Sequence, residues 1–151
     1  MDREDWERIA KVKLYGGGIL YSDVERNVNE LINEGYPVEV GGFLNKREAE
    51  ALFSWADFIL IPSRIESIPV VFSDAMQSLC PVIAMPTGDL PRLITEYEVG
   101  NLAKCISSSS FAEAIKKSLS INPAELRSNL VKASEDFSVD AAVNDFLRNI
   151  T

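Results

Sequence analysis

The sequence predicts an α/β protein with a parallel sheet and helices on both faces. Short apolar segments alternate along the chain with longer segments whose apolar residues recur at helical spacing. Residues 58–61 are apolar throughout, as expected of a central strand that is buried on both sides. Most predicted strands run directly into glycine or proline, where the loops of such a sheet begin. We therefore expect one Rossmann-like parallel sheet of five or six strands.

The strands are predicted at 11–15, 38–40, 58–61, 82–85 and 101–105. Capping boxes, in which Ser or Asn is followed three residues later by Glu, are expected to begin three helices (Ser22 with Glu25, Asn45 with Glu48, Ser110 with Glu113). Gly35 ends the first helix, and Pro69 and Pro91 suit the first turns of two others. Asn122-Pro123 and Ser138 are expected to open two helices of a helical tail over about 122–151. No long linker or repeat separates these elements, so residues 1–151 are predicted to form a single domain.

The composition excludes several classes of function. The chain has 151 residues and a formal charge of −8, which disfavours nucleic-acid binding because that needs a basic face. It has no histidine, which removes the commonest general base and most zinc sites. Cys80 and Cys105 stand far apart without a CxxC pair, so we expect buried thiols in a reducing compartment.

The apolar runs are too short to cross a membrane, which takes about 20 residues. Residues 1–6 are charged where a secretion signal would be apolar. We therefore expect a cytoplasmic protein without a transmembrane segment, whose contact with a membrane would come through a partner.

Glycines and acidic residues follow the predicted strands, where open α/β sheets bind their ligands. The segments concerned are 16–18, 41–44, 62–66 and 85–89. Glycine at a strand end is often a simple turn, and the chain has no GxGxxG or GxxxxGK[ST] motif. These residues alone therefore indicate a ligand edge without identifying the ligand.

Residues 62–76 read P-S-x-x-E-S-I-P-V-V-F-S-D-A-M, with C-P-V-I-A at 80–84 and T-G-x-x-P at 87–91. This order and spacing resembles the C-terminal halves of the retaining glycosyltransferases of family 4, the "group 1" enzymes with the GT-B fold. The segments L-Y-G-G-G at 14–18, V-E-V-G-G-F-L at 38–44 and G-N-L at 100–102 resemble further elements of that half. The resemblance covers roughly residues 11–120.

The resemblance implies a role for each matching position. Glu66 corresponds to the acid that binds the donor sugar, as the catalytic candidate, and Asp74 to the acid that binds the ribose. A carboxylate suits both tasks because it can accept two hydrogen bonds from neighbouring hydroxyls. The other expected donor-binding residues are the backbone amides facing the diphosphate (Ile68, Val70 and Val71), the loop that holds the base (Gly42, Phe43 and Leu44) and two glycines of the first loop (Gly16 and Gly18).

Simpler interpretations stay open for the same residues. Glu66 and Asp74 can be solvated surface acids, and the family usually has Glu at the position of Asp74. Arg64 can be a solvated charge or a neighbour of the phosphate. Phe43 can belong to the core instead of binding a base. Trp6 and Trp55 are expected to be packing residues.

Two departures from the family matter. Its members begin this half with an earlier strand that carries Gly-Arg and a nearby Lys for the diphosphate, and no such unit precedes Gly16 here. Where the family often has Glu after the glycine-proline turn, this chain has Arg92.

The resemblance therefore predicts the nucleotide-sugar-binding half of a retaining hexosyltransferase. It would use a nucleoside-diphosphate sugar, need a separate N-terminal acceptor half, and be inactive as this isolated chain. No metal or cofactor is expected. The alternative is a noncatalytic, degenerate glycosyltransferase-like binding or interaction module. A third and weaker possibility is another nucleotide-binding α/β protein.

Overall fold

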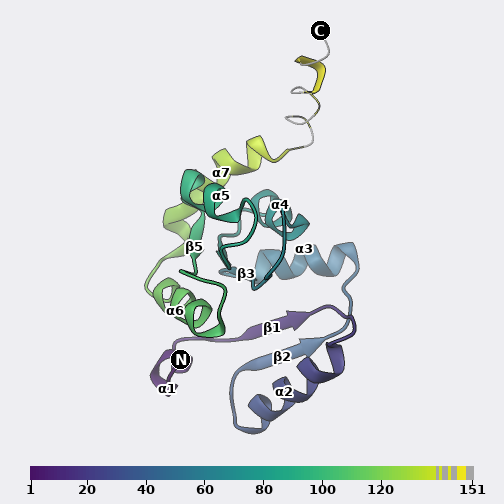
Figure 1. The fold of residues 1–151 in the computed structure, drawn as a ribbon, viewed down its shortest axis with the longest axis vertical. Helices are drawn as coiled ribbons and strands as arrows, with labels where there is room; N and C mark the ends of the chain where they lie inside the picture. The colour runs from purple at the N-terminus through teal and green to yellow at the C-terminus, as the bar shows by residue number, and fades with distance from the viewer. Residues whose placement is uncertain (139, 141–142, 144–145, 149–151) are drawn as a thin grey trace. The chain divides into compact units, whose positions relative to one another are not determined.

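The computed structural model describes residues 1–138, 140, 143 and 146–148 (Figure 1). The chain forms two compact units, Met1–Ala51 and Leu52–Thr151, and the division falls inside helix α3 (Lys46–Trp55). Each unit contains a parallel sheet of its own.

The first unit is built on strands β1 (Val12–Tyr15) and β2 (Val38–Gly41). They pair in parallel, with Val12 opposite Val38 and Tyr15 opposite Gly41. Helix α2 (Tyr21–Asn33) connects them and packs on β2, and the short helix α1 (Arg3–Glu7) precedes β1. Figure 1 shows α2 lying along the β1–β2 pair.

This first unit has little fully buried apolar surface. Val28 of α2 and Val38 of β2 are the buried apolar side chains among its residues. The rings of Trp6 and Tyr36 pack with their centroids 5.1 Å apart. Packing of the unit therefore depends mainly on half-buried side chains.

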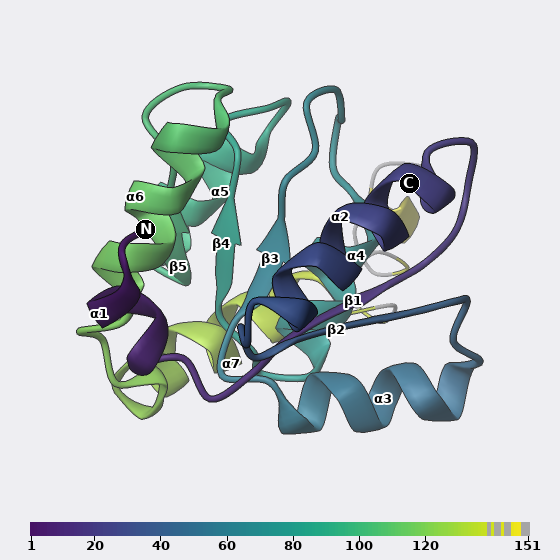
Figure 2. The same ribbon diagram turned by 90° about the horizontal axis from the view of Figure 1, so that it is seen from below.

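The second unit contains the sheet β3-β4-β5, whose strands lie side by side in Figure 2. Its elements in chain order are β3 (Ile59–Ile61), α4 (Val70–Gln77), β4 (Val82–Ala84), α5 (Leu90–Tyr97), β5 (Gly100–Leu102), α6 (Ser108–Ser118), the 3₁₀ helix η1 (Pro123–Leu126) and α7 (Arg127–Asp136). Both strand pairs are parallel. The central strand β4 is buried at every position.

Side chains of β4 alternate between two apolar clusters. Val82 and Ala84 belong to a cluster with buried residues of α4, α5 and α7. Ile83 and Met85 belong to a second cluster, with buried residues of α6. Helices thus cover both faces of this sheet, as the alternating pattern predicted.

The five predicted strands and their parallel direction are confirmed, but the single sheet is wrong. Within the described residues no ladder joins β1 and β2 to the other three strands. In a doubly wound unit the first strand lies in the middle of the sheet. Here Arg3–Glu7 form helix α1 ahead of β1. The segment 58–61, expected to be central, provides β3, which is an edge strand among the described residues.

The capping predictions had mixed outcomes. The Asn45–Glu48 box is confirmed, with N···O distances of 2.8 and 3.1 Å. Ser22 does not cap α2, because the helix starts one residue earlier and the Glu25 carboxylate accepts a hydrogen bond from Tyr21 instead.

The predicted cap at Ser110 is also wrong. Helix α6 is capped by Ser107, whose hydroxyl accepts the N–H of Ser110 at 3.2 Å. The four consecutive serines made the exact start ambiguous, since each is a suitable cap.

In the predicted tail, Asn122 caps η1 as expected, accepting the N–H of Ala124 at 3.1 Å. The helix predicted from Ser138 falls largely outside the described residues. None of the helices that are described is both long and apolar enough to cross a membrane.

Candidate functional site

The predicted site residues are divided between the two units. Gly16, Gly18, Gly42, Phe43 and Leu44 follow the strands of the first unit, and Glu66, Ile68, Val70, Val71 and Asp74 follow β3 in the second.

In the first unit, the carboxyl ends of β1 and β2 are joined by backbone hydrogen bonds. The N–H of Gly16 donates to the carbonyl of Gly42 at 3.1 Å and also approaches that of Gly41 at 3.4 Å. The carbonyl of Gly18 accepts the N–H of Tyr21, which leads into α2. The structure therefore brings Gly16 and Gly42 together at one end of this sheet.

Two aromatic rings lie against glycine backbone at this end. A Cβ on Gly17 would be 2.5 Å from the Phe43 ring, and a Cβ on Gly41 would be equally close to the Tyr15 ring. Phe43 is nevertheless 83% exposed. Phe43 is therefore a surface residue and not part of the core, and its ring is accessible to a ligand.

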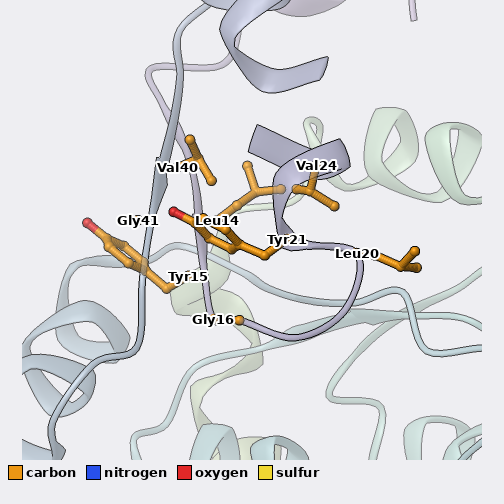
Figure 3. Close-up of a pocket in the computed structure, with 9 residues that line it drawn as sticks. Leu14, Tyr15, Gly16, Leu20, Tyr21, Val24, Val40 and Gly41 are labelled. Atoms are coloured by element: carbon orange, nitrogen blue, oxygen red, sulfur yellow. The ribbon is translucent and has the colours of Figure 1, made fainter. Parts of the chain in front are cut away.

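A cavity of about 250 Å³ lies beside these residues in the first unit (Figure 3). Side chains from β1, β2 and the start of α2 surround it, and its lining is mostly apolar (Leu14, Tyr15, Gly16, Gly17, Leu20, Tyr21, Val24, Val40 and Gly41). Tyr15 and Tyr21 were not singled out from the sequence. Their signal was their position, because one tyrosine precedes the glycine run and the other opens the following helix.

Polar contacts orient the two tyrosines. Tyr15 donates to the Glu39 carboxylate at 2.6 Å, and Lys11 pairs with the same carboxylate at 2.7 Å. The hydrogen bonds from Lys11 and Tyr15 lower the pKa of Glu39. The bond that Tyr15 donates to the Glu39 carboxylate in turn raises the pKa of Tyr15. Tyr21 donates to Glu25 at 3.4 Å, a long hydrogen bond.

In the second unit, the loop 62–69 connects β3 to the start of α4. Glu66 is exposed in this loop, and its neighbour Ile65 is 92% exposed. Pro69 is buried and is the N-cap of α4, without a side-chain hydrogen bond to the helix. The first N–H groups of a helix have no partner within it, so those of Val70 and Val71 can serve a ligand.

Asp74 lies one turn inside α4. Its neighbours Phe72, Ala75 and Met76 are buried in the core, whereas Val70 is 75% exposed and Asp74 is exposed. Residues four apart share a helix face, and helical side chains lean toward the N-terminus. Asp74 is therefore on the solvent face of α4, one turn after the exposed Val70.

Two arginines close in sequence to the loop 62–69 and the start of α4 differ in their contacts. Arg92 pairs with Glu96 on α5 at 2.9 Å, and Arg64 is exposed in the loop itself. Across the described part of the chain, no group of three or more acidic or cysteine side chains is arranged to hold a metal ion.

Parallel strands whose carboxyl ends lead into helices define the open α/β class of proteins, in which ligands bind beyond those strand ends. A family model described as glycosyl transferases group 1 matches residues 16–137. The chain therefore belongs to the group 1 glycosyltransferases.

Individual relatives agree with this family. The chain is 28% identical over 97% of its length to a D-inositol 3-phosphate glycosyltransferase of Corynebacterium aurimucosum and covers 36% of that protein. It superposes on sucrose-phosphate synthase of Thermosynechococcus elongatus with a TM-score of 0.67 and 25% identity, covering 93% of this chain and 38% of the other.

A third protein shares the fold at low identity. The catalytic domain of starch synthase IV of Arabidopsis thaliana, solved with ADP and acarbose, gives a TM-score of 0.73 at 15% identity, over 94% of this chain and 32% of the other. The chain thus spans about a third of the length of each of these glycosyltransferases, and the predicted fold class, one half of a GT-B fold, is confirmed.

Proposed function

We propose that the chain forms the donor-binding half of a retaining glycosyltransferase that takes a hexose from a nucleoside-diphosphate sugar. The observation that carries this proposal is the start of α4. There an uncapped first turn lies between two exposed acids, Glu66 and Asp74, inside the segment that matches the family.

The diphosphate is proposed to bind at the first turn of α4. The free N–H groups of Val70 and Val71, together with that of Ile68, provide donors, and the helix dipole adds partial positive charge. ADP in the starch synthase IV structure supports a nucleoside diphosphate as a ligand of this fold.

The two acids are proposed to have separate tasks. Asp74 is exposed one turn inside α4, and this position close to the helix start suits the ribose hydroxyls next to the diphosphate. Glu66 precedes the helix in an exposed loop, which suits the hydroxyls of the transferred sugar. For the first unit taken by itself, the family resemblance proposes that the loop Gly42–Leu44, with the exposed Phe43 ring, contacts the base and that Gly16 and Gly18 are donor-binding residues.

Chemistry of this kind depends on positioning and on stabilising the departing diphosphate, with no cofactor or metal in the proposal. The acceptor is proposed to bind to a separate N-terminal half, so that the isolated chain binds donor without transferring sugar. A cytoplasmic location remains part of the same proposal.

Calorimetric or ligand-observed NMR titration tests the proposal. The ligands are the bare nucleotides UDP, GDP and ADP and the corresponding nucleotide sugars that carry a hexose, called the conjugates below. We expect dissociation constants of about high micromolar to millimolar, because the diphosphate would be held mainly by backbone N–H groups and the helix dipole. Asp74→Ala should weaken bare nucleotides and conjugates alike, and Glu66→Ala should weaken the conjugates only. Each loss should be about ten- to a hundredfold, the value of a hydrogen bond to a charged group.

Glu113→Ala provides a matched control, because it removes an exposed acid from α6 and should leave both affinities unchanged. Equal losses from Asp74→Ala and Glu66→Ala would refute the division of tasks. If no nucleotide binds at all, the noncatalytic binding or interaction module becomes the better proposal.

A further inference from the structure

The loop that carries Glu66 has few contacts of its own. Residues 64–68 are exposed, and the loop is anchored at its end by the buried Pro69. A carboxylate in an exposed loop has many accessible directions, and fixing one of them costs conformational entropy. The position of Glu66 therefore depends on what holds the backbone on either side of it.

The backbone around Glu66 is held by the turn Thr87-Gly88-Asp89, which follows β4 and is called here the 87–89 turn. The N–H of Asp89 donates to the carbonyl of Ser67 at 3.1 Å. The hydroxyl of Thr87, which is buried, donates to the carbonyl of Ser63 at 3.4 Å. The turn thus contacts the loop both before and after Glu66.

Gly88 makes the closest approach. A methyl group on Gly88 would overlap the carbonyl oxygens of Glu66 and Ser67, both of which are backbone atoms that cannot rotate away. Gly88 also has φ +53°, which a residue with a side chain adopts only with strain. The absence of a side chain is therefore what lets the two backbones pack together.

We infer that the 87–89 turn is a positioning element that sets the direction of Glu66 toward the donor sugar. Because the peptide groups that follow Glu66 rest on Gly88 and Asp89, the turn fixes the backbone from which the Glu66 side chain starts. Catalytic and binding groups need placement to within about half an ångström, which an unsupported loop does not provide. This inference rests on the proposed function and assigns the residues that make its sugar contact precise.

The test compares Gly88→Ala with Gly35→Ala. Gly35 also has a positive φ, +86°, but a Cβ there meets nothing within 4 Å, so this control shares the backbone strain without the overlap. The wild type should bind the nucleotide sugar about ten- to a hundredfold more tightly than Glu66→Ala does. This ratio is the gain that the Glu66 contact provides. Gly88→Ala should abolish that gain and change bare-nucleotide affinity less than twofold, whereas Gly35→Ala should retain it.

The double variant Glu66→Ala/Gly88→Ala separates positioning from general damage. If the turn acts through Glu66, the double variant should bind the conjugate as Glu66→Ala does, with no additional loss. Equal weakening of bare nucleotide and conjugate by Gly88→Ala, or a conjugate affinity equal to the wild type, would overturn the inference. Should Gly88→Ala fail to fold, Thr87→Val keeps the side-chain shape, removes the hydroxyl donor and should lower the gain severalfold.

A ligand-free measurement keeps this inference separate from the proposed function. In ¹⁵N NMR spectra, Gly88→Ala should shift the amide signals of Glu66 and Ser67 and speed hydrogen exchange at the Asp89 amide, and Gly35→Ala should do neither. Unchanged signals would refute the positioning role even if nucleotide sugars bind. Shifted signals without nucleotide-sugar binding by the wild type would instead refute the proposed function.

Discussion

A buried polar contact connects the edge strand β5 to helix α6. The side-chain amide of Asn101 donates to the hydroxyl of Ser118 at 2.7 Å, and that hydroxyl donates to the carbonyl of Ala114 at 2.9 Å. Asn101 and Ser118 are both buried. Ser118→Ala should therefore leave an amide group of Asn101 without its acceptor in a site that water does not reach.

The expected cost of Ser118→Ala is about 1–3 kcal/mol in the free energy of unfolding, the penalty for an unsatisfied buried donor. Asn101→Leu, which keeps the number and branching of heavy atoms, removes the donor, while Ser118 keeps its bond to Ala114. In the double variant no buried donor is left without an acceptor. Its loss in the free energy of unfolding should therefore be smaller than the sum of the two single losses by about 1 kcal/mol or more. Such a difference is a large fraction of a typical domain stability of about 5–15 kcal/mol.

Urea unfolding followed by far-ultraviolet circular dichroism measures these free energies for the four members of the cycle. Ser134→Ala is the matched control, because that hydroxyl donates within its own helix to the Val131 carbonyl and accepts no buried donor in the described structure. The control should change stability by less than about 0.5 kcal/mol. A Ser118→Ala loss as small as that of the control, or strict additivity in the double variant, would refute the reasoning.

Two further predictions concern titratable groups. Cys80 is buried as expected, and burial raises its pKa to about 12, but the expectation that Cys105 is buried is wrong. Cys105 is exposed, and hydrogen bonds with Ser107 and Ser110 lower its pKa. Ellman's reagent at pH 8 should therefore label Cys105 rapidly and Cys80 only on unfolding, and fast labelling that survives Cys105→Ser would contradict this. The hydrogen bond from Tyr97 to Asp136 raises the pKa of Tyr97 from 10.0 to about 12. The stabilising effect of this hydrogen bond should be complete below pH 10 and lost as the pH rises toward 12. Tyr97→Phe should therefore reduce the fall in the free energy of unfolding between pH 10 and 12, and an unchanged slope would contradict this role of the bond.

Local signals in the sequence were sufficient where the partners are neighbours. The Asn45–Glu48 capping box joins groups three residues apart, and Pro69 starts α4 through its own restricted φ. The spacing of apolar residues that predicted the five strands and their helices is likewise a local pattern, because it involves residues only a few positions apart. The motifs around Glu66 and Asp74 were sufficient to predict the family for the same reason, since they lie in one continuous stretch.

Other properties depended on segments distant in sequence. The apolar run 58–61 has the composition of a central strand, yet no neighbouring residue reveals that, within the described residues, β3 pairs with β4 alone. Phe43 has the side chain of a core residue, yet apart from its contact with the backbone of Gly17 most of its surface is exposed, which its local sequence does not reveal. Side-chain composition describes what a residue can bury, whereas the fold decides what is available to cover it.

The sequence by itself therefore determined the fold class, the family and the candidate acids, because periodicity, capping and motif order are properties of adjacent residues. The tertiary structure decided how those acids are held. Gly88 is recognisable in the sequence as a turn glycine, but its contact with the carbonyls of Glu66 and Ser67 spans more than twenty residues. Such a contact depends on which two backbones the parallel sheet brings together, and this is a property of the packed chain.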